Sequence, residues 1–166
     1  PISGDTLRRV GSSGHRRVTA MFMNTNRGKR SIAVDMKDPR GAEVVDRLLE
    51  GADVFLENFR AGIAERLGLG YERLAGRNPR LIYVSVNGVG ENGPMVGRRI
   101  YDTVIQGHAG ICRVQGDDAP QLMRTLLGDK VAPTMVAQAI TAALYERSRS
   151  GRGQRVDMSM LHALIW

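Results

Sequence analysis

The side chains in this sequence that could do chemistry are a carboxylate before a long helix pattern, many arginines and three histidines. Asp129 stands in the run Leu127-Gly128-Asp129-Lys130, just ahead of that helix pattern. Taken alone, such a carboxylate belongs to a turn or to a helix N-terminus, where the helix dipole favours negative charge. Lysine and arginine number 24 against 17 acidic residues, which gives a net charge of +7. This balance indicates either an anionic partner or solvated basic helix faces.

The histidines and the cysteine make no metal-binding or disulfide pattern. Cys112 is the single cysteine, and His15, His108 and His162 are scattered along the chain. We therefore expect no metal site and no internal disulfide, and we interpret His108 and Cys112 as structural residues. A chain without disulfides fits a reducing cytoplasm, which is the location we expect.

Membrane and nucleic-acid partners are both disfavoured. Apolar runs such as Leu81–Val84 are short, whereas a membrane helix needs about 20 apolar residues. The start at Pro1 lacks the apolar segment of a signal peptide. Aromatic residues make up only 5%, and the arginines are dispersed without a nucleic-acid-binding motif.

The first part of the chain alternates strand and helix patterns. Residues 1–30 are rich in glycine, serine and arginine and predict an irregular basic lead-in, so residues 31–166 form the body of the domain. Pro39 opens a helix that ends at Gly51, because proline suits the first helical position and glycine follows the last. The predicted strands are Ser31–Met36, Asp53–Leu56 and Leu81–Val86, with short helices at Gly62–Leu67 and Tyr71–Gly76.

This alternation predicts an α/β fold with a parallel sheet, in which ligands bind at the carboxyl ends of the strands. Those ends fall near Asp35–Lys37, Glu57–Arg60 and Asn87–Gly90. The glycine-rich loop from Gly88 to Pro94 lacks the spacing of a nucleotide-binding loop.

The second part of the chain is mostly helical. We expect a helix around Tyr101–Ile111, a polar hinge at Gly116–Pro120 and a long helix at Val131–Arg147 with Pro133 in its first turn. A turn at Ser150–Gly153 leads into a further element at Arg155–Trp166.

Several segments, in this order and spacing, resemble the family III CoA-transferases, also called the CaiB/BaiF family. They are Asn26–Lys37, Ala52–Arg60, Arg66–Tyr71, Asn78–Tyr83 and Gly151–Gln154. The family includes formyl-CoA transferase, carnitine CoA-transferase and α-methylacyl-CoA racemase.

The resemblance implies a Rossmann-like parallel sheet with flanking helices, as part of the CoA-binding large domain of that family. It also implies that this chain is truncated at both ends, that a second, smaller domain lies outside it, and that the fragment alone is inactive. Members of the family form interlocked homodimers, which we expect of the complete protein.

The resemblance also implies the residues of the site. Asp129 matches the catalytic aspartate that receives coenzyme A from an acyl-CoA and passes it to a carboxylic acid. No metal takes part in this chemistry, and CoA is a substrate. Arg66 and Arg99 are the expected contacts to its phosphates. The full set of expected CoA-binding residues is Val34, Asp35, Met36, Lys37, Asn58, Phe59, Arg60, Arg66, Arg99, Ile100, Tyr101 and Asp102.

Tyr101 favours transferase over racemase chemistry. The family's racemases carry histidine at this position as one of two bases, and a tyrosine is a poor base at neutral pH. A racemase-like isomerase and a CoA-binding pseudoenzyme remain the alternatives. The donor and acceptor acids are not selected by any residue in this chain.

Overall fold

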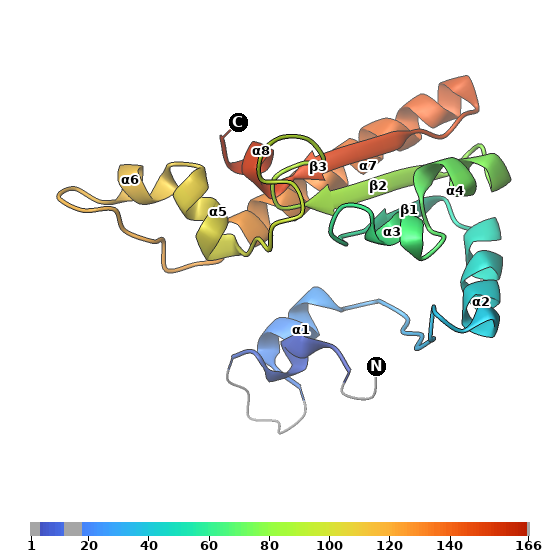
Figure 1. Cartoon of the computed structure of the whole chain (residues 1–166), viewed down its shortest axis with the longest axis horizontal. Coiled ribbons are helices and arrows are strands. Elements are labelled where there is room, and N and C mark those ends of the chain that lie inside the picture. Colours follow the sequence, from blue (N-terminus) through green and yellow to red (C-terminus); the bar gives the residue numbers. More distant parts are fainter. Residues whose placement is uncertain (1–3, 12–17, 166) are drawn as a thin grey trace. The chain divides into compact units, whose positions relative to one another are not determined.

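The computed structural model describes residues 4–11 and 18–165 of the 166-residue chain. The chain divides into two compact units, Pro1–Asp46 and Arg47–Trp166, and the boundary falls inside helix α2 (Pro39–Glu50). The first unit holds a short 3-10 helix, η1 (Thr6–Arg9), and helix α1 (Ala20–Thr25) (Figure 1). The second unit holds the sheet and the remaining helices.

Two short helices therefore lie in the lead-in that the composition predicts to be irregular. Thr19 caps α1, because its hydroxyl oxygen accepts the Phe22 N–H at 3.1 Å. The same hydroxyl donates to the Leu7 carbonyl at 2.6 Å. The guanidinium of Arg8 lies 4.0 Å from the centre of the Phe22 ring. The hydrogen bond from Thr19 to Leu7 and the cation–π contact between Arg8 and Phe22 thus join η1 to α1.

The strand predicted at Ser31–Met36 is wrong, because this segment is irregular. Ile32 is 58% exposed. Asp35 turns the chain, since its carboxylate accepts the Lys37 N–H at 3.0 Å and its carbonyl accepts the Asp38 N–H at 3.1 Å. An alternating pattern becomes a strand only where a neighbouring strand satisfies its backbone, and the described sheet contains no partner for this segment.

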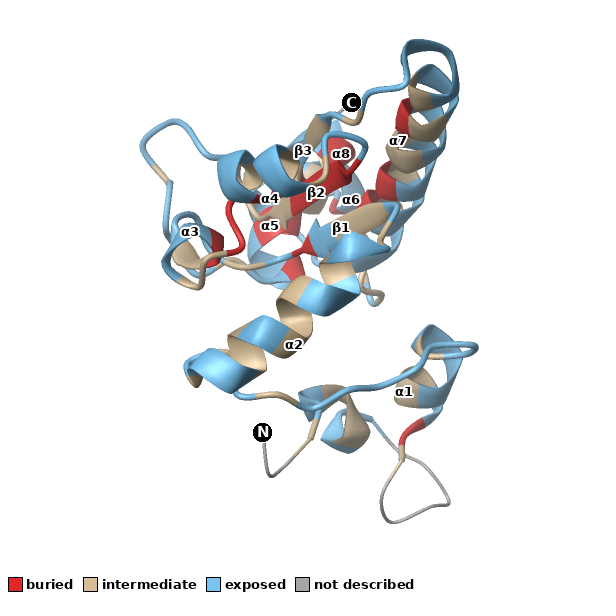
Figure 2. Ribbon diagram, turned by 90° about the vertical axis from the view of Figure 1, so that its right-hand side faces the viewer, coloured by how far each residue is buried: buried red, intermediate tan, exposed pale blue. Residues whose placement is uncertain are grey.

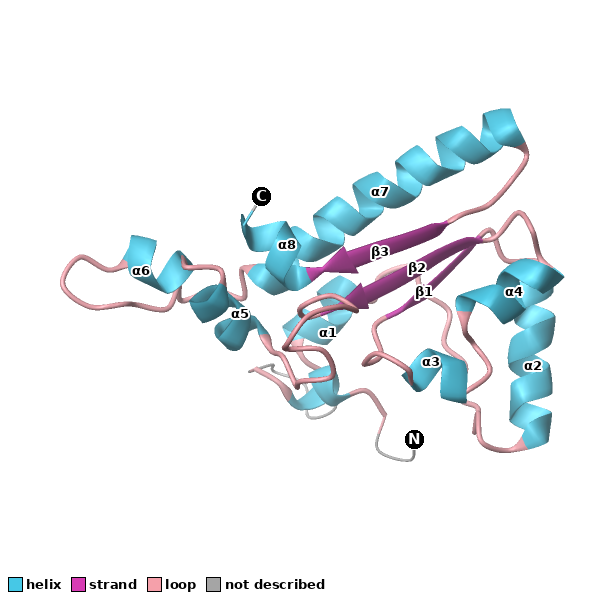
Figure 3. Ribbon diagram, turned by 45° about the horizontal axis from the view of Figure 1, so that its top comes forward, coloured by secondary structure: helices cyan, strands magenta, loops and turns pink. Residues whose placement is uncertain are grey.

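The sheet of the second unit has three parallel strands in the order β1-β2-β3. They are β1 (Val54–Glu57), β2 (Ile82–Asn87) and β3 (Arg155–Ser159) (Figure 3). In the register, Val54 pairs with Ile82 and Tyr83 pairs with Arg155. The strands predicted at Asp53–Leu56 and Leu81–Val86 are confirmed, and β3 supplies the third strand.

Helices cover both faces of this sheet. Val136 and Ala143 of helix α7 (Gly128–Ser150) pack on Ile82 and Val84. Leu74 of helix α4 (Tyr71–Arg77) packs with Tyr83 on the opposite face. Figure 2 shows buried positions in red on β2 and along α7. The helices of this unit are α3 (Ile63–Arg66), α4 (Tyr71–Arg77), α5 (Asp102–His108), α6 (Ile111–Gln115), α7 (Gly128–Ser150) and α8 (Met160–Ile165). The parallel α/β fold is thereby confirmed.

Helix α7 begins at Gly128, earlier than the predicted start at Val131. The prediction placed Pro133 in the first turn, but the helix extends further because a carboxylate from another helix caps it. Asp102 of α5 accepts the N–H groups of Gly128 and Asp129. Such a cap is invisible to local sequence rules. None of the helices in the described part of the chain has the length and apolar character that a membrane crossing requires.

Candidate functional site

A small pocket of about 90 Å³ lies at the carboxyl ends of β1 and β2. Three segments line it: Asn58–Ala61 after β1, Asn87–Gly90 after β2, and the approach to α5 with Gly97, Arg98 and Ile100. Ligand sites in parallel α/β folds favour this edge of the sheet. The structure therefore brings four of the predicted residues together, namely Asn58, Phe59, Arg60 and Ile100.

The backbone around this pocket is held by side chains and by one close approach. The buried carboxylate of Glu57 accepts the Phe59 N–H at 2.6 Å, which fixes the turn after β1. The side-chain oxygen of Asn87 accepts the Gly90 N–H after β2. A Cβ atom at Gly88 would collide with the side chain of Ile100. Glycine at this position therefore allows the two lining segments to meet.

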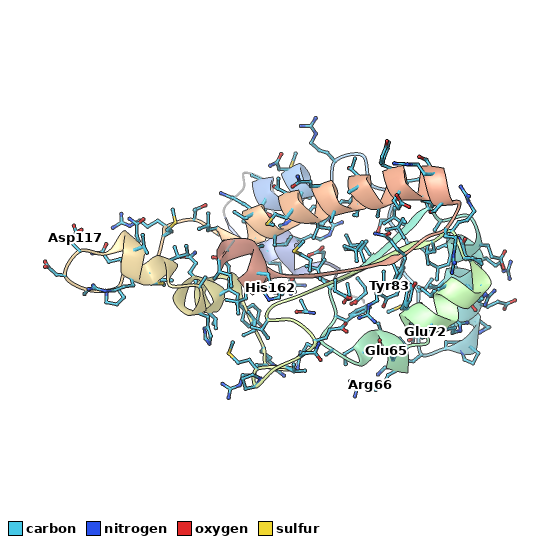
Figure 4. All side chains as sticks on the ribbon, turned by 90° about the horizontal axis from the view of Figure 1, so that it is seen from above. Glu65, Arg66, Glu72, Tyr83, Asp117 and His162 are labelled. Atoms are coloured by element: carbon cyan, nitrogen blue, oxygen red, sulfur yellow. The ribbon has the colours of Figure 1, made fainter. Side chains whose placement is uncertain are left out.

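The arginines that we expect to contact CoA all have exposed side chains, but they lie at different places relative to the pocket. Arg60 lines the pocket, whereas Arg66 ends α3 and points away from the sheet in Figure 4. Arg98 lines the pocket and its neighbour Arg99 does not. Guanidinium groups bind phosphates through paired N–H donors, so these exposed side chains are suited to an anionic ligand.

The residues Val34, Asp35, Met36 and Lys37 belong to the first unit, in the irregular segment before α2. The turn at Asp35 is tight, and a Cβ atom at Gly41 would collide with its carbonyl oxygen. The role of this segment in binding CoA stays a prediction.

Asp129 lies in the first turn of α7, and its side chain is exposed. Asp102, at the first residue of α5, is only 4% exposed. One oxygen of Asp102 accepts the Gly128 N–H at 2.6 Å and the Asp129 N–H at 3.1 Å. The backbone of the turn that carries the accessible Asp129 side chain is thus capped from outside by a buried carboxylate. Tyr101, just before Asp102, is 68% exposed.

The environment of Asp129 raises the pKa of its carboxyl group above the ordinary value. Partial burial is the larger cause and the negative charge of Asp102 is the second. An ionised carboxylate with a raised pKa is more basic, and it attacks a carbonyl carbon more readily than an ordinary carboxylate. The arrangement can therefore serve as a nucleophile that stays open to solvent and substrate.

Sequence reasoning missed several residues of this region. Gln106 hydrogen-bonds Asp102 and is completely buried, and its only sequence signal is its position one helical turn after Asp102. Asn87 and Gly88 line the pocket within the strand end Asn87–Gly90 where the sequence placed ligands, although the resemblance did not include them among the CoA-binding residues. No feature of the sequence indicated that Arg98, and not its neighbour Arg99, lines the pocket.

Among residues 4–11 and 18–165, no group of three or more His, Cys, Asp or Glu side chains is placed to hold a metal ion. His108 is exposed and contacts the Val104 carbonyl at 2.9 Å within its own helix. This contact agrees with a structural role. His15 lies outside the described residues.

Comparison with known proteins gives one consistent family. The sequence model of CoA-transferase family III matches residues 1–166. The chain is 38% identical over 169 residues to the succinate–glutarate CoA-transferase of Agrobacterium fabrum, with 97% of this chain and 42% of that protein covered. It is 41% identical over 147 residues to the acetyl-CoA:oxalate CoA-transferase of Acetobacter aceti, with 87% and 38% covered.

Solved structures agree with these relatives. A CaiB/BaiF family protein from Brucella suis superposes with a TM-score of 0.90 at 39% identity, covering 98% of this chain and 44% of that one. The chain therefore spans less than half the length of the proteins that it matches.

Proposed function

This chain belongs to CoA-transferase family III, and from that premise we propose that it supplies the nucleophile and part of the CoA-binding surface of a transferase. The complete protein moves coenzyme A from an acyl-CoA donor to a carboxylic acid acceptor. The observation that carries the proposal is the exposed carboxylate of Asp129, held in the first turn of α7 by the buried Asp102.

The first half of the reaction transfers CoA to the protein. The Asp129 carboxylate attacks the thioester carbonyl carbon of the donor, the carbon–sulfur bond breaks, and CoA leaves as a thiolate. This step leaves a mixed anhydride between Asp129 and the donor acyl group. The thiolate then attacks the Asp129 carbonyl carbon, which releases the donor as a carboxylate and forms an aspartyl-CoA thioester.

The second half runs in reverse with the acceptor. The acceptor carboxylate attacks the aspartyl-CoA thioester and expels the CoA thiolate, which leaves a new mixed anhydride. The thiolate attacks the acceptor carbonyl carbon of that anhydride. The acceptor leaves as an acyl-CoA, and Asp129 returns to its free carboxylate.

We assign the CoA substrate to the carboxyl edge of the sheet and its surrounding arginines. Asn58, Phe59 and Ile100 line the pocket and would contact the neutral part of CoA, and Arg60 and Arg98 line it as cations. Arg66 and Arg99 are exposed and available for phosphates. The backbone around Val34 would frame another part of the ligand.

Tyr101 is the residue that favours transfer over racemisation. It occupies the position where the family's racemases carry a histidine base, and it is exposed just before α5. Removing and returning an α-proton needs a base on each face of the carbon. A tyrosine side chain is less suited than histidine to act as such a base.

The complete protein is proposed to act as an interlocked homodimer in the cytoplasm. Several large apolar side chains of the second unit are exposed to solvent, and a partner subunit would bury this apolar surface. Val114 is 88% exposed, Tyr145 is 66% exposed and Leu122 is 50% exposed.

The test traps the acyl or CoA adduct on Asp129 in the complete protein. The protein is incubated with a panel of acyl-CoA donors and then with hydroxylamine, and the peptide that contains Asp129 is weighed by mass spectrometry. We expect a hydroxamate on that peptide, with no adduct in Asp129→Ala. Asp118→Ala is the matched control, because Asp118 is an exposed carboxylate in the hinge after α6.

Two outcomes would refute this proposal. An adduct that survives in Asp129→Ala would move the nucleophile elsewhere. No adduct with any donor, together with deuterium exchange at the α-carbon of an acyl-CoA, would instead assign racemase chemistry.

A further inference from the structure

Gln106 is a polar side chain with no exposed surface at all, in the middle of α5. A buried amide is costly unless its donors and acceptor all find partners. The amide nitrogen donates to Asp102 Oδ2 at 2.7 Å and to the Thr125 carbonyl at 2.9 Å. The amide oxygen accepts the Met123 N–H at 2.9 Å. Both N–H donors and the oxygen are thus in use.

These hydrogen bonds connect Gln106 to the two parts of the chain that position Asp129. One part is the carboxylate of Asp102, whose other oxygen accepts the N–H groups of Gly128 and Asp129. The other is the segment that contains Met123 and Thr125, which leads directly into α7. The first turn of α7 is therefore fixed from both sides through one amide.

The packing leaves little freedom at this point. A Cβ atom at Gly128 would lie 3.1 Å from Asp102 Oδ1 and 3.1 Å from the Met160 methyl carbon. Asp102 thus approaches the start of α7 closely, and its carboxylate is oriented by donors on both of its oxygens. Removing the Gln106 donor would free one oxygen and let the carboxylate rotate.

We propose that Gln106 is a positioning residue for acyl transfer: it acts through Asp102 to hold Asp129 in its reactive position. This inference rests on the proposed function of Asp129 as the nucleophile. Gln106 does not line the pocket. Its loss should therefore slow the chemical step more than it weakens binding of the acyl-CoA.

The test compares Gln106→Met with wild type in the complete protein. Methionine keeps the length of the side chain but removes all three hydrogen bonds. We expect the rate of adduct formation on Asp129 and kcat to fall ~10- to 100-fold, with KM for acyl-CoA changed less than ~3-fold. Gln138→Met is the matched control, because Gln138 is exposed on α7, and it should match wild type.

A double-mutant cycle shows whether Gln106 acts through Asp102. If it does, Gln106→Met combined with Asp102→Asn is no slower than the slower single variant. The inference would be overturned if the double variant showed the product of the two single-variant rate losses. A Gln106→Met variant with the wild-type rate of adduct formation would also overturn it. If Gln106→Met does not fold, Gln106→Glu carries the same comparison, since it keeps the acceptor for Met123 and loses at least one donor.

The two proposals fail differently in this experiment. Wild type without any adduct on Asp129 refutes the proposed function, and the role of Gln106 falls with it. A wild-type adduct that forms equally fast in Gln106→Met refutes only the role of Gln106.

Discussion

Replacing Gly128 by alanine should displace the nucleophile while leaving the fold intact. The new Cβ atom would stand 3.1 Å from Asp102 Oδ1 and 3.3 Å from the Ile105 methyl carbon Cγ2. Both distances are shorter than an ordinary van der Waals contact. Asp102 cannot retreat without lengthening the bonds that it accepts from Gly128 at 2.6 Å and from Asp129 at 3.1 Å.

Two opposing effects set the size of the stability change. Alanine is favoured over glycine in a helix by about 1 kcal/mol, and this gain is smaller near a helix end. A weakened hydrogen bond to a charged carboxylate costs about 1.5–3 kcal/mol. The net result is a destabilisation of about 0.5–2 kcal/mol. A shift of the first turn by a fraction of an ångström should slow adduct formation on Asp129 ~10-fold or more.

The assay measures both quantities on the complete protein. Urea denaturation gives the stability change, and hydroxylamine trapping gives the rate. Gly107→Ala is the matched control, because Gly107 lies inside α5 and its added Cβ meets no atom within 4 Å. That variant should gain up to about 1 kcal/mol and keep its rate. A Gly128→Ala variant that gains stability like Gly107→Ala, with an unchanged rate, would refute the close contact with Asp102.

Asp129→Asn should raise the stability of the protein at neutral pH, because the folded state raises the pKa of this carboxyl group and so disfavours its charged form. This gain over wild type should vanish below pH 3.8, where the carboxyl group is protonated in both states, and unfolding midpoints measured across pH check it. Arg147→Ala should lose about 1–3 kcal/mol of stability in urea denaturation, since its side chain is 13% exposed and its guanidinium is hydrogen-bonded at 2.8 and 3.0 Å. Gly88→Ala should weaken CoA binding about tenfold in calorimetry, because its Cβ collides with Ile100.

Each of these three predictions has its own control. An Asp129→Asn variant that is only as stable as wild type across the whole pH range would mean that burial does not disfavour the charged carboxylate of Asp129. Arg149→Ala, in the exposed last turn of α7, should lose far less stability than Arg147→Ala. Gly76→Ala is the control for Gly88→Ala, because Gly76 lies in α4 and an added Cβ atom there meets no atom within 4 Å, so this variant should bind CoA like wild type. A Gly88→Ala variant that binds CoA as tightly as Gly76→Ala would refute the effect of the collision.

Local sequence patterns were sufficient for the elements that have clear apolar spacing or glycine and proline signals. The strand at Leu81–Val86 and the helix ending at Gly51 are found within a residue or so, because apolar spacing and glycine or proline signals are local. The same logic failed at Ser31–Met36, where the strand pattern lacks a partner. Strand formation depends on pairing between distant segments, and a single segment does not contain that information.

The site was predicted by resemblance more than by pattern. In the sequence, Asp129 does not differ from an ordinary carboxylate at a helix N-terminus. The structure adds the hydrogen bond from its backbone N–H to Asp102. That contact joins residues 27 apart in the sequence, so no local rule anticipates it. Gln106 was missed for the same reason, since a buried glutamine reveals itself only through its partners.

The order of the strands has a consequence for when this site can form. β2 ends at Asn87 and its neighbour β3 begins at Arg155, and the glycine loop, α5 and α7 all lie between them in the chain. Pairing the two strands must close this long connection, which costs chain entropy and slows folding. We expect the carboxylate of Asp129 to reach its position only after this closure. Its reactivity should then appear late during refolding, together with the final burial of the sheet.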